Sequence, residues 1–179
     1  MKFTTTRIQG AYVIELEKRE DERGSLARTW DREVFRQHGV EVDLLEGYVS
    51  RTENKGTLRG LHYQVQPNAE AKLVRCSRGS YYEVVLDLRE SSETFGCWEG
   101  LTFRASDYKM LYVPPLCAHA VLTLEDETEL INFSSATYSP SCERGVRYDD
   151  PRFNILWPME VTTISAKDSA WEDFDDHCR

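Results

Sequence analysis

The sequence has no run of about 18 apolar residues, which a membrane-spanning helix needs, and no charged segment leading into a short apolar stretch at its N-terminus. We therefore expect neither membrane insertion nor export, and the cytosol is the expected compartment. The five cysteines are scattered and include no CxxC pair. This pattern predicts free thiols and argues against disulfides or a cysteine metal site.

Several motifs that carry chemistry in other proteins are also missing. The chain has no GxSxG elbow for a serine hydrolase, and neither a Walker motif nor a GxGxxG loop for phosphate groups. No HxH pair occurs, and the residue two positions after His62 is Gln64, so we expect no bound metal. We expect no cofactor, and any bound nucleotide must be held by side chains.

Basic residues are fewer than acidic ones, 22 against 31, which gives a formal net charge of -9. Nucleic acids bind basic surfaces, so a nucleic acid is not an expected partner. Local arginine clusters, such as Arg19, Arg23 and Arg28, could still line a positive cleft for a small anionic ligand.

At 179 residues the chain has the length of one domain, and no linker or repeat divides it, so we expect a single domain over residues 1–179. Short segments rich in β-branched and aromatic residues alternate with turns, which predicts strands. A long succession of such strands predicts an all-β sandwich or barrel. The predicted strands cover residues 11–16, 44–50, 57–65, 72–76, 81–88, 97–103, 109–113, 118–124 and 129–134.

One helix is expected at residues 32–38. Asp31 suits its N-cap, Gly39 suits a left-handed stop, and Val34 is expected to face inward. A second helix is expected near the acidic C-terminus, where His177 is expected to be solvated.

His62 is the most informative histidine. Strand alternation places Gly60, His62 and Gln64 on one face, which is polar within a barrel. Two interpretations stay open for His62, an interior hydrogen-bonded histidine and a catalytic base. His119 follows two prolines and precedes an apolar run, which favours a histidine that is bonded to a turn and supports the fold.

A series of short motifs spans nearly the whole chain: residues 21–24 (DERG), 57–64 (TLRGLHYQ), 72–76 (KLVRC), 85–89 (VLDLR), 91–98 (SSETFGCW), 138–140 (YSP), 149–151 (DDP), 157–158 (WP) and 165–168 (SAKD). In order and spacing they resemble the dTDP-4-dehydrorhamnose 3,5-epimerase family. The resemblance implies a cupin jelly-roll barrel with short flanking helices. It also implies a homodimer in which N-terminal residues of one subunit reach the site of the other.

That family inverts carbons next to the C4 ketone of nucleotide-linked 4-keto-6-deoxy sugars, in deoxysugar and surface-polysaccharide synthesis. Such chemistry needs a base and a cation that stabilises the enolate. By resemblance His62 is the base, Asp168 orients its ring, and Lys72 stabilises the enolate. Arg59 and Arg23 match arginines that hold the pyrophosphate.

The sequence departs from the family at the acid that returns the proton to the opposite face. Asn132 occupies the position of the family's tyrosine, and an amide is a poor proton donor. Three alternatives follow: another acid, inversion of one carbon only, or sugar-nucleotide binding without catalysis. Tyr138 is the nearest candidate acid, and inversion at C5 is the favoured restricted outcome.

A second departure lies at the nucleotide end of the expected site. Arg28 stands where the family has a glutamate, and Glu46 and Tyr48 replace a glutamine and an asparagine. Arginine donors suit the acceptors of cytosine and Glu46 suits its amino group, so we expect CDP first and GDP second, rather than dTDP. Solvated charges at the rim are the alternative. The candidate substrate-binding residues are Arg23, Arg28, Glu46, Tyr48, Arg59, Gln64 and His119.

A third departure lies beside His119, where Leu116 and Ala120 stand in place of family glycines. If those glycines supply a positive φ, the turn is expected to differ here.

An epimerase is favoured over two other functions. A pure sugar-nucleotide-binding cupin has no need of a His and Asp dyad. A ketoisomerase on the same barrel would also have to move the carbonyl, and it would yield a 3-keto product.

Overall fold

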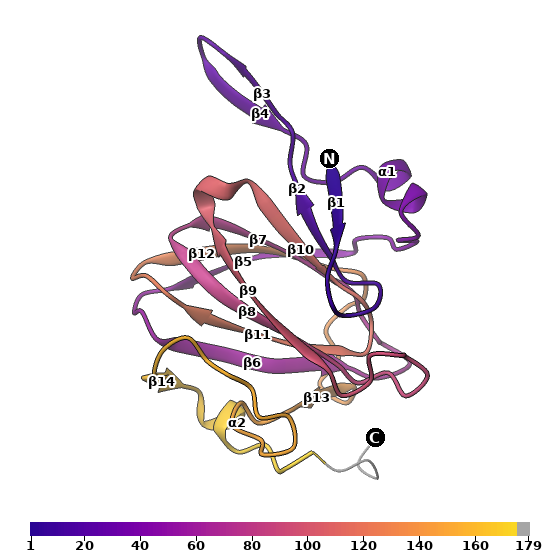
Figure 1. The fold of residues 1–179 in the computed structure, drawn as a ribbon, viewed down its shortest axis with the longest axis vertical. Helices are drawn as coiled ribbons and strands as arrows, with labels where there is room; N and C mark the ends of the chain where they lie inside the picture. Colours follow the sequence, from indigo (N-terminus) through magenta and orange to yellow (C-terminus); the bar gives the residue numbers. More distant parts are fainter. Residues whose placement is uncertain (175–179) are drawn as a thin grey trace.

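The computed structural model describes residues 1–174, and within this range no helix is long and apolar enough to cross a membrane. Two β sheets face each other across the middle of the molecule (Figure 1). The first has the order β1 (Lys2–Thr5), β2 (Tyr12–Glu15), β10 (Lys109–Val113), β7 (Lys72–Arg78), β12 (Thr128–Ser134) and β5 (Glu46–Thr52). The second has the order β13 (Glu143–Gly145), β6 (Thr57–Gln64), β11 (Cys117–Thr123), β8 (Ser80–Asp87) and β9 (Trp98–Arg104).

Smaller elements lie at the edge of these sheets or outside them. The strand β14 (Thr163–Ile164) runs parallel to the start of β6 and leads into the short helix α2 (Ala166–Ser169). The strands β3 (Lys18–Asp21) and β4 (Gly24–Ala27) form a separate hairpin that projects from the barrel (Figure 1).

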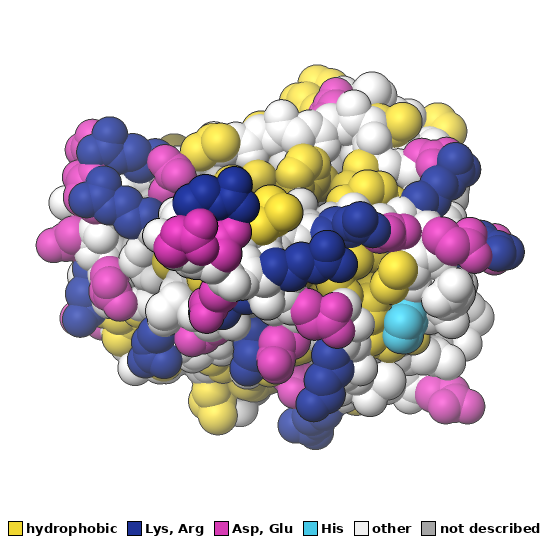
Figure 2. All heavy atoms as spheres, turned by 90° about the horizontal axis from the view of Figure 1, so that it is seen from above, with side chains coloured by type: hydrophobic (Ala, Val, Ile, Leu, Met, Phe, Trp, Pro, Cys, Tyr) yellow, Lys and Arg dark blue, Asp and Glu magenta, His cyan; other side chains and the backbone are white. Residues whose placement is uncertain are grey.

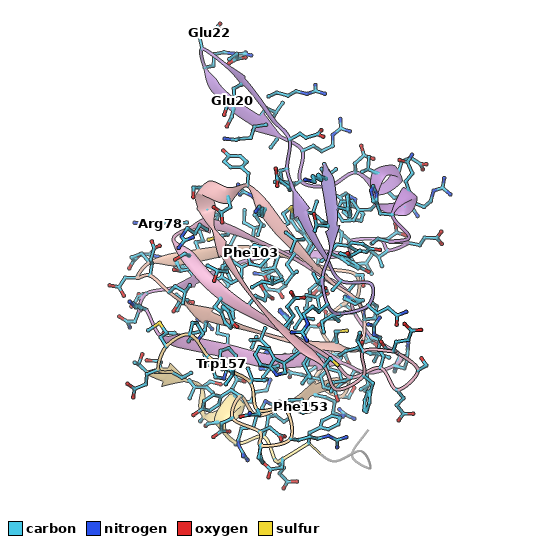
Figure 3. All side chains as sticks on the ribbon, in the orientation of Figure 1. Glu20, Glu22, Arg78, Phe103, Phe153 and Trp157 are labelled. Atoms are coloured by element: carbon cyan, nitrogen blue, oxygen red, sulfur yellow. The ribbon has the colours of Figure 1, made fainter. Side chains whose placement is uncertain are left out.

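The predicted all-β fold is confirmed, because each predicted segment contains a strand. The projecting hairpin was not predicted. Its first strand is charged and fully exposed, and Glu20 and Glu22 lie far from the sheets (Figure 3). A strand that buries no side chain has no apolar alternation, which is the signal that sequence analysis depends on.

The space between the sheets holds the central core. On β10, Leu111 points inward while Met110 points to the outer side, as the two-residue repeat of a strand requires. Tyr81 and Phe103 stack from neighbouring strands of the second sheet, with ring centroids 5.4 Å apart. Phe103 lies in the middle of the barrel (Figure 3).

Both sheets are also covered on their outer faces. Phe153 and Trp157, from the segment after β13, lie beneath the second sheet (Figure 3). The helix α1 (Arg32–Gln37) covers the first sheet through Phe35, which is fully buried. Strands buried on both faces read as nearly continuous apolar runs, which explains the sequence of β8.

The predicted caps of α1 are confirmed, but the predicted inward residue is wrong. Asp31 accepts hydrogen bonds from the backbone N–H groups of Glu33 and Val34, and Gly39 has a φ of +77°. Phe35 is the buried anchor and Val34 is only partly covered. A helix of this length buries only one large side chain. The contact of Phe35 with the sheet therefore fixes how α1 is rotated about its axis.

The turn before β11 keeps a left-handed residue although it has no glycine there. Leu116 adopts a φ of +62°. A non-glycine residue in this region costs about 1–2 kcal/mol, which the surrounding packing must supply. The lack of glycine therefore does not remove the left-handed conformation at this position.

The cysteines of the described range are free thiols. Burial raises the pKa of Cys76 to about 11 and that of Cys117 to about 12, so both stay protonated at neutral pH. Cys178 and His177 lie outside the described residues.

The arginine cluster expected to form a positive cleft is neutralised by neighbouring carboxylates. Arg23 bonds to Asp21 within the hairpin, and Arg28 pairs with Asp31. Figure 2 shows basic and acidic side chains interspersed over the face seen from the hairpin end. Within residues 1–174, these arginines therefore form no cleft of a single positive sign.

We predict that Gly60→Ala destabilises the fold by about 3 kcal/mol or more, because two costs combine. A Cβ atom at Gly60 would lie 2.5 Å from the carbonyl oxygen of His119 and 2.7 Å from Cα of Ala120, and φ is +117°. Gly24 is a matched control with a φ of +126° and no atom within 4 Å of its added Cβ. Urea unfolding should show a much smaller loss for Gly24→Ala, and equal losses would contradict the crowding at Gly60.

Candidate active site

A cleft of about 760 Å³ opens between the two sheets at one end of the barrel. One wall is formed by β5 and β12 of the first sheet, and the other by β6 and β11 of the second. The segment from Thr163 to Asp168 closes one side. A smaller hollow of about 200 Å³ shares Tyr48, His62 and His119 with this cleft, so the two form one site.

His62 and Asp168 form a dyad at the floor of the cleft. The Nε2 atom of His62 lies 2.6 Å from Oδ1 of Asp168, and the backbone N–H of Gly60 donates to Oδ2 at 3.2 Å. Asp168 is almost fully buried, whereas a third of the His62 side chain is exposed to the cleft. The carboxylate therefore fixes the orientation of a ring that a ligand can reach.

The surroundings of Asp168 favour its ionised form. Burial acts to raise its pKa, but the hydrogen bonds to His62 and Gly60 outweigh burial, and the pKa lies below its ordinary value. Asp168 reaches this position because Ser165 caps α2 by accepting a bond from the Asp168 N–H, while β14 aligns the segment with β6.

Lys72 lies in the smaller hollow with His62. Its Nζ is 2.7 Å from Oε1 of Glu70 and 3.2 Å from the hydroxyl oxygen of Tyr48. Both side chains of the ion pair are largely buried, which holds the ammonium in place. A fixed cation beside the base is what a developing enolate oxygen requires.

His119 does not bond to a turn, contrary to expectation. It stands directly opposite His62 in the β6–β11 pairing and lines both parts of the site. Its Nδ1 lies 2.7 Å from Oε1 of Glu83, which is fully buried. Sequence analysis missed Glu83, although a glutamate at an inward position of an apolar strand was a visible signal.

Asn132 and Tyr48 share the wall opposite the dyad. They are directly paired on the antiparallel strands β12 and β5, so both side chains point to the inner face. Asn132 is buried, whereas Tyr48 is partly exposed at the cleft. The position where the resemblance predicts the family's tyrosine therefore holds an amide that has a phenol as its immediate neighbour.

Tyr138 lines the smaller hollow, but its hydroxyl is engaged. It donates to Oε2 of Glu143 at 2.8 Å, and this bond raises the pKa of Tyr138. Glu143 in turn pairs with Lys167 at 2.5 Å. Burial acts to raise the pKa of Glu143, but the bonds to Lys167 and Tyr138 lower it overall.

Arg59 lines the cleft, where its Nε donates to Thr52 at 3.1 Å. Gln64 is buried, and its amide bonds to the backbone carbonyls of Asn68 and Thr137 and to the N–H of Ser139. Gln64 therefore supports the loop after β12, and because it also lines the smaller hollow, its expected role in substrate binding stays a prediction.

Three of the predicted binding residues lie away from this cleft within one chain. Arg23 belongs to the projecting hairpin, and Arg28 lines a separate hollow of about 380 Å³ beside α1. Glu46 starts β5 opposite Ser134 and lines neither part of the site. The structure brings together His62, Asp168, Lys72, Arg59, His119, Asn132 and Tyr48, with Tyr138 in the smaller hollow.

No group of three histidine, cysteine or carboxylate side chains that could hold a metal ion is found among residues 1–174. The inner face instead carries two histidine–carboxylate dyads and a lysine held by Glu70. Groups that move protons and stabilise negative charge are therefore assembled in a jelly-roll barrel. This combination defines a cupin whose site is equipped for acid–base catalysis.

The family follows from comparison with known proteins. The sequence profile of dTDP-4-dehydrorhamnose 3,5-epimerase matches residues 5–176. The enzyme of that name from Shigella flexneri is 36% identical over 177 residues, which cover 98% of this chain and 97% of the relative. The chain belongs to this family and is an isomerase of the carbohydrate epimerase class.

Solved structures agree with this assignment. A dTDP-4-dehydrorhamnose 3,5-epimerase from Elizabethkingia anophelis superposes with a TM-score of 0.94 at 31% identity, covering 99% of this chain and 98% of the other. A 3'-monoepimerase from Streptomyces bikiniensis, in complex with dTDP-quinovose, gives a TM-score of 0.83 at 31% identity, covering 92% and 83%. The fold is therefore shared with an enzyme named for epimerisation at both C3 and C5 and with one named for epimerisation at C3 alone.

We predict that Asp168→Asn lowers the free energy of unfolding by about 2 kcal/mol at pH 6, because it removes charge-assisted hydrogen bonds from a buried site. The Asp168 pKa is lowered from 3.8, so its stabilisation is present above pH 3.8 and is lost as the pH falls through the lower native value. The deficit of the variant should therefore shrink between pH 6 and pH 3 in urea unfolding. Glu172→Gln, which removes an exposed carboxylate, is the control. A deficit that does not change with pH would contradict the assigned role.

Proposed function

We propose that this enzyme epimerises a nucleotide-linked 4-keto-6-deoxyhexose at a carbon next to the C4 ketone. One observation carries the proposal: His62, whose ring is bonded to Asp168, and Lys72 line the same smaller hollow of the site. Carbon acids next to a ketone need a base and a cation at the carbonyl oxygen. The relatives' names support the substrate class.

In the proposed reaction, His62 takes the proton from the carbon and becomes imidazolium. Asp168 balances that charge, because its carboxylate is buried against the ring. The electron pair moves to the C4 oxygen, where Lys72 stabilises the enolate. His119 is placed beside His62 and supplies a second polar contact for the same sugar.

The nucleotide part of the substrate is proposed to lie along the cleft toward Arg59. A homodimer would complete this end of the site, with Arg23 of the partner subunit and Arg28 of the partner subunit carried by the projecting hairpin and the segment after it. Two observations support this arrangement: the hairpin projects from the barrel, and the described residues leave the cleft open. Guanidinium groups suit a pyrophosphate because they donate in a planar fork.

Inversion is proposed to be restricted to one carbon. Asn132 removes the acid at the family's usual position, and a donor placed elsewhere serves one ring carbon better than two. The choice of C5 stays a prediction. The Streptomyces bikiniensis relative is named a 3'-monoepimerase, which indicates inversion at C3. Inversion at C3 and at C5 must therefore be measured separately.

We predict that incubation with candidate 4-keto sugar nucleotides in deuterated water gives deuterium at C3 or C5. His62→Ala should reduce this exchange by at least about 100-fold, since general base catalysis contributes 10²–10⁴. NMR of the recovered sugar identifies the carbon and its configuration. His38→Ala, on the outer helix, is the control. Absence of exchange with every candidate would leave a sugar-nucleotide-binding cupin, and a 3-keto product would indicate a ketoisomerase.

We expect the nucleotide base to be cytosine, because Arg28 offers only donors where the family has a glutamate. Calorimetry with CDP, GDP, UDP and dTDP should show tightest binding of CDP, and Arg28→Glu should reduce that preference by about tenfold, the effect of roughly one charged hydrogen bond. Arg36→Glu, an exposed arginine on α1, is the matched control. Tightest binding of dTDP that Arg28→Glu leaves unchanged would contradict this expectation.

A further inference from the structure

The loss of the family's tyrosine leaves the proposed reaction without its usual proton donor. We propose that Tyr48, on the strand next to Asn132, is the catalytic acid that returns the proton to the sugar. The inference rests on the proposed function, since it names the second proton-transfer group of the same site.

The pairing of β5 with β12 places Tyr48 beside the vacated position. Asn132 and Tyr48 are directly opposite in the antiparallel register. Directly opposite side chains on one face have Cβ atoms about 4.5–5.5 Å apart. A phenol at position 48 instead of position 132 therefore lies on the neighbouring strand but on the same wall of the cleft.

Tyr48 also faces the base from the correct side. His62 belongs to β6 in the second sheet, whereas Tyr48 belongs to β5 in the first. Both residues line the large cleft and the smaller hollow. A sugar ring held between the sheets would have the base at one face and the phenol at the other, as inversion requires.

The hydroxyl of Tyr48 is aimed at the cation of the site. Its oxygen lies 3.2 Å from Nζ of Lys72, and the ammonium stands 5.5 Å from the centre of the Tyr48 ring. When the phenol gives up its proton, a negative charge remains on that oxygen. Lys72 balances this charge through a charge-assisted hydrogen bond, as it balances the enolate earlier in the reaction.

Tyr138 is less suited to the same task. Its proton is already donated to Glu143, and that bond raises the pKa of Tyr138, which makes it a weaker acid. It lines only the smaller hollow, whereas Tyr48 lines both parts of the site. Tyr138 also follows β12 in a loop, while Tyr48 is fixed by the strand pairing of β5.

The protons balance over one turnover. His62 breaks the C–H bond and holds that proton, while the electron pair forms the enolate. The enolate carbon then takes the proton of the Tyr48 hydroxyl at its opposite face, which leaves a tyrosinate. Water carries a proton from the His62 imidazolium to the tyrosinate, and both groups return to their starting states.

The test compares two rates in deuterated water, proton wash-out at the reacting carbon and inversion of that carbon. In Tyr48→Phe we expect inversion to fall by at least about 100-fold. Wash-out should stay within about threefold, because His62 can still remove a proton and return a deuteron to the same face. Tyr138→Phe is measured in parallel as the rival acid. Tyr12→Phe, on β2 and outside both parts of the site, is the control and should keep inversion within about threefold of the unchanged enzyme. Circular dichroism and urea unfolding confirm that all the variants are folded.

Two results would overturn the proposal while leaving the epimerase assignment intact. Unchanged inversion in Tyr48→Phe would show that another group is the acid, and a large loss in Tyr138→Phe would identify that group. Equal losses of wash-out and inversion in Tyr48→Phe would show that Tyr48 only positions Lys72. An unchanged enzyme that exchanges no proton with any candidate would instead overturn the proposed function, and this inference with it.

Discussion

The contact between the Asp168 carboxylate and β6 is the constraint on which the site depends. One oxygen holds the His62 ring and the other accepts the Gly60 N–H, so a single side chain ties the C-terminal segment to the barrel wall and orients the proposed base. Burying a carboxylate is unfavourable unless its oxygens are bonded. Both the strand β14 and the cap at Ser165 serve to deliver Asp168 to these partners.

The requirement that buried carboxylates be bonded also applies to the rest of the inner face. Glu70 and Glu83 are also buried carboxylates, and each is matched to a basic side chain, Lys72 and His119 respectively. Breaking a buried pair leaves an uncompensated charge, so these partners are constrained to stay together. The result is a preorganised set of charges in the cleft of a protein whose formal net charge is -9. The acidity of the whole chain therefore says little about the ligand that the cleft accepts.

The strands were predictable because their side chains alternate between two buried faces, and β10 was predicted to the residue. The hairpin of β3 and β4 was not, since β3 is fully exposed and only Ala27 of β4 is partly buried. His62 and Asp168 could be predicted as a pair only through family motifs. No local sequence pattern indicates that Asp168, which follows the last strand, lies against β6. Glu83 was missed because its partner, His119, is distant in sequence and only the pairing of β8 with β11 brings the two together. Glu70 was missed although its partner, Lys72, is only two residues away.

The pairing of Asn132 with Tyr48 would let the proposed proton donor stand on a neighbouring strand without changing its place in space. The family resemblance alone predicts a missing acid at Asn132 and, separately, a tyrosine in place of an asparagine at Tyr48. Antiparallel register joins the two observations, because a residue directly opposite lies on the same face at nearly the same depth. The Tyr48 hydroxyl lies 3.2 Å from Nζ of Lys72, so in the proposed reaction one cation would serve both anionic oxygens in turn. The position of a proton donor on the wall of a sheet is therefore more strictly constrained than the strand that supplies it.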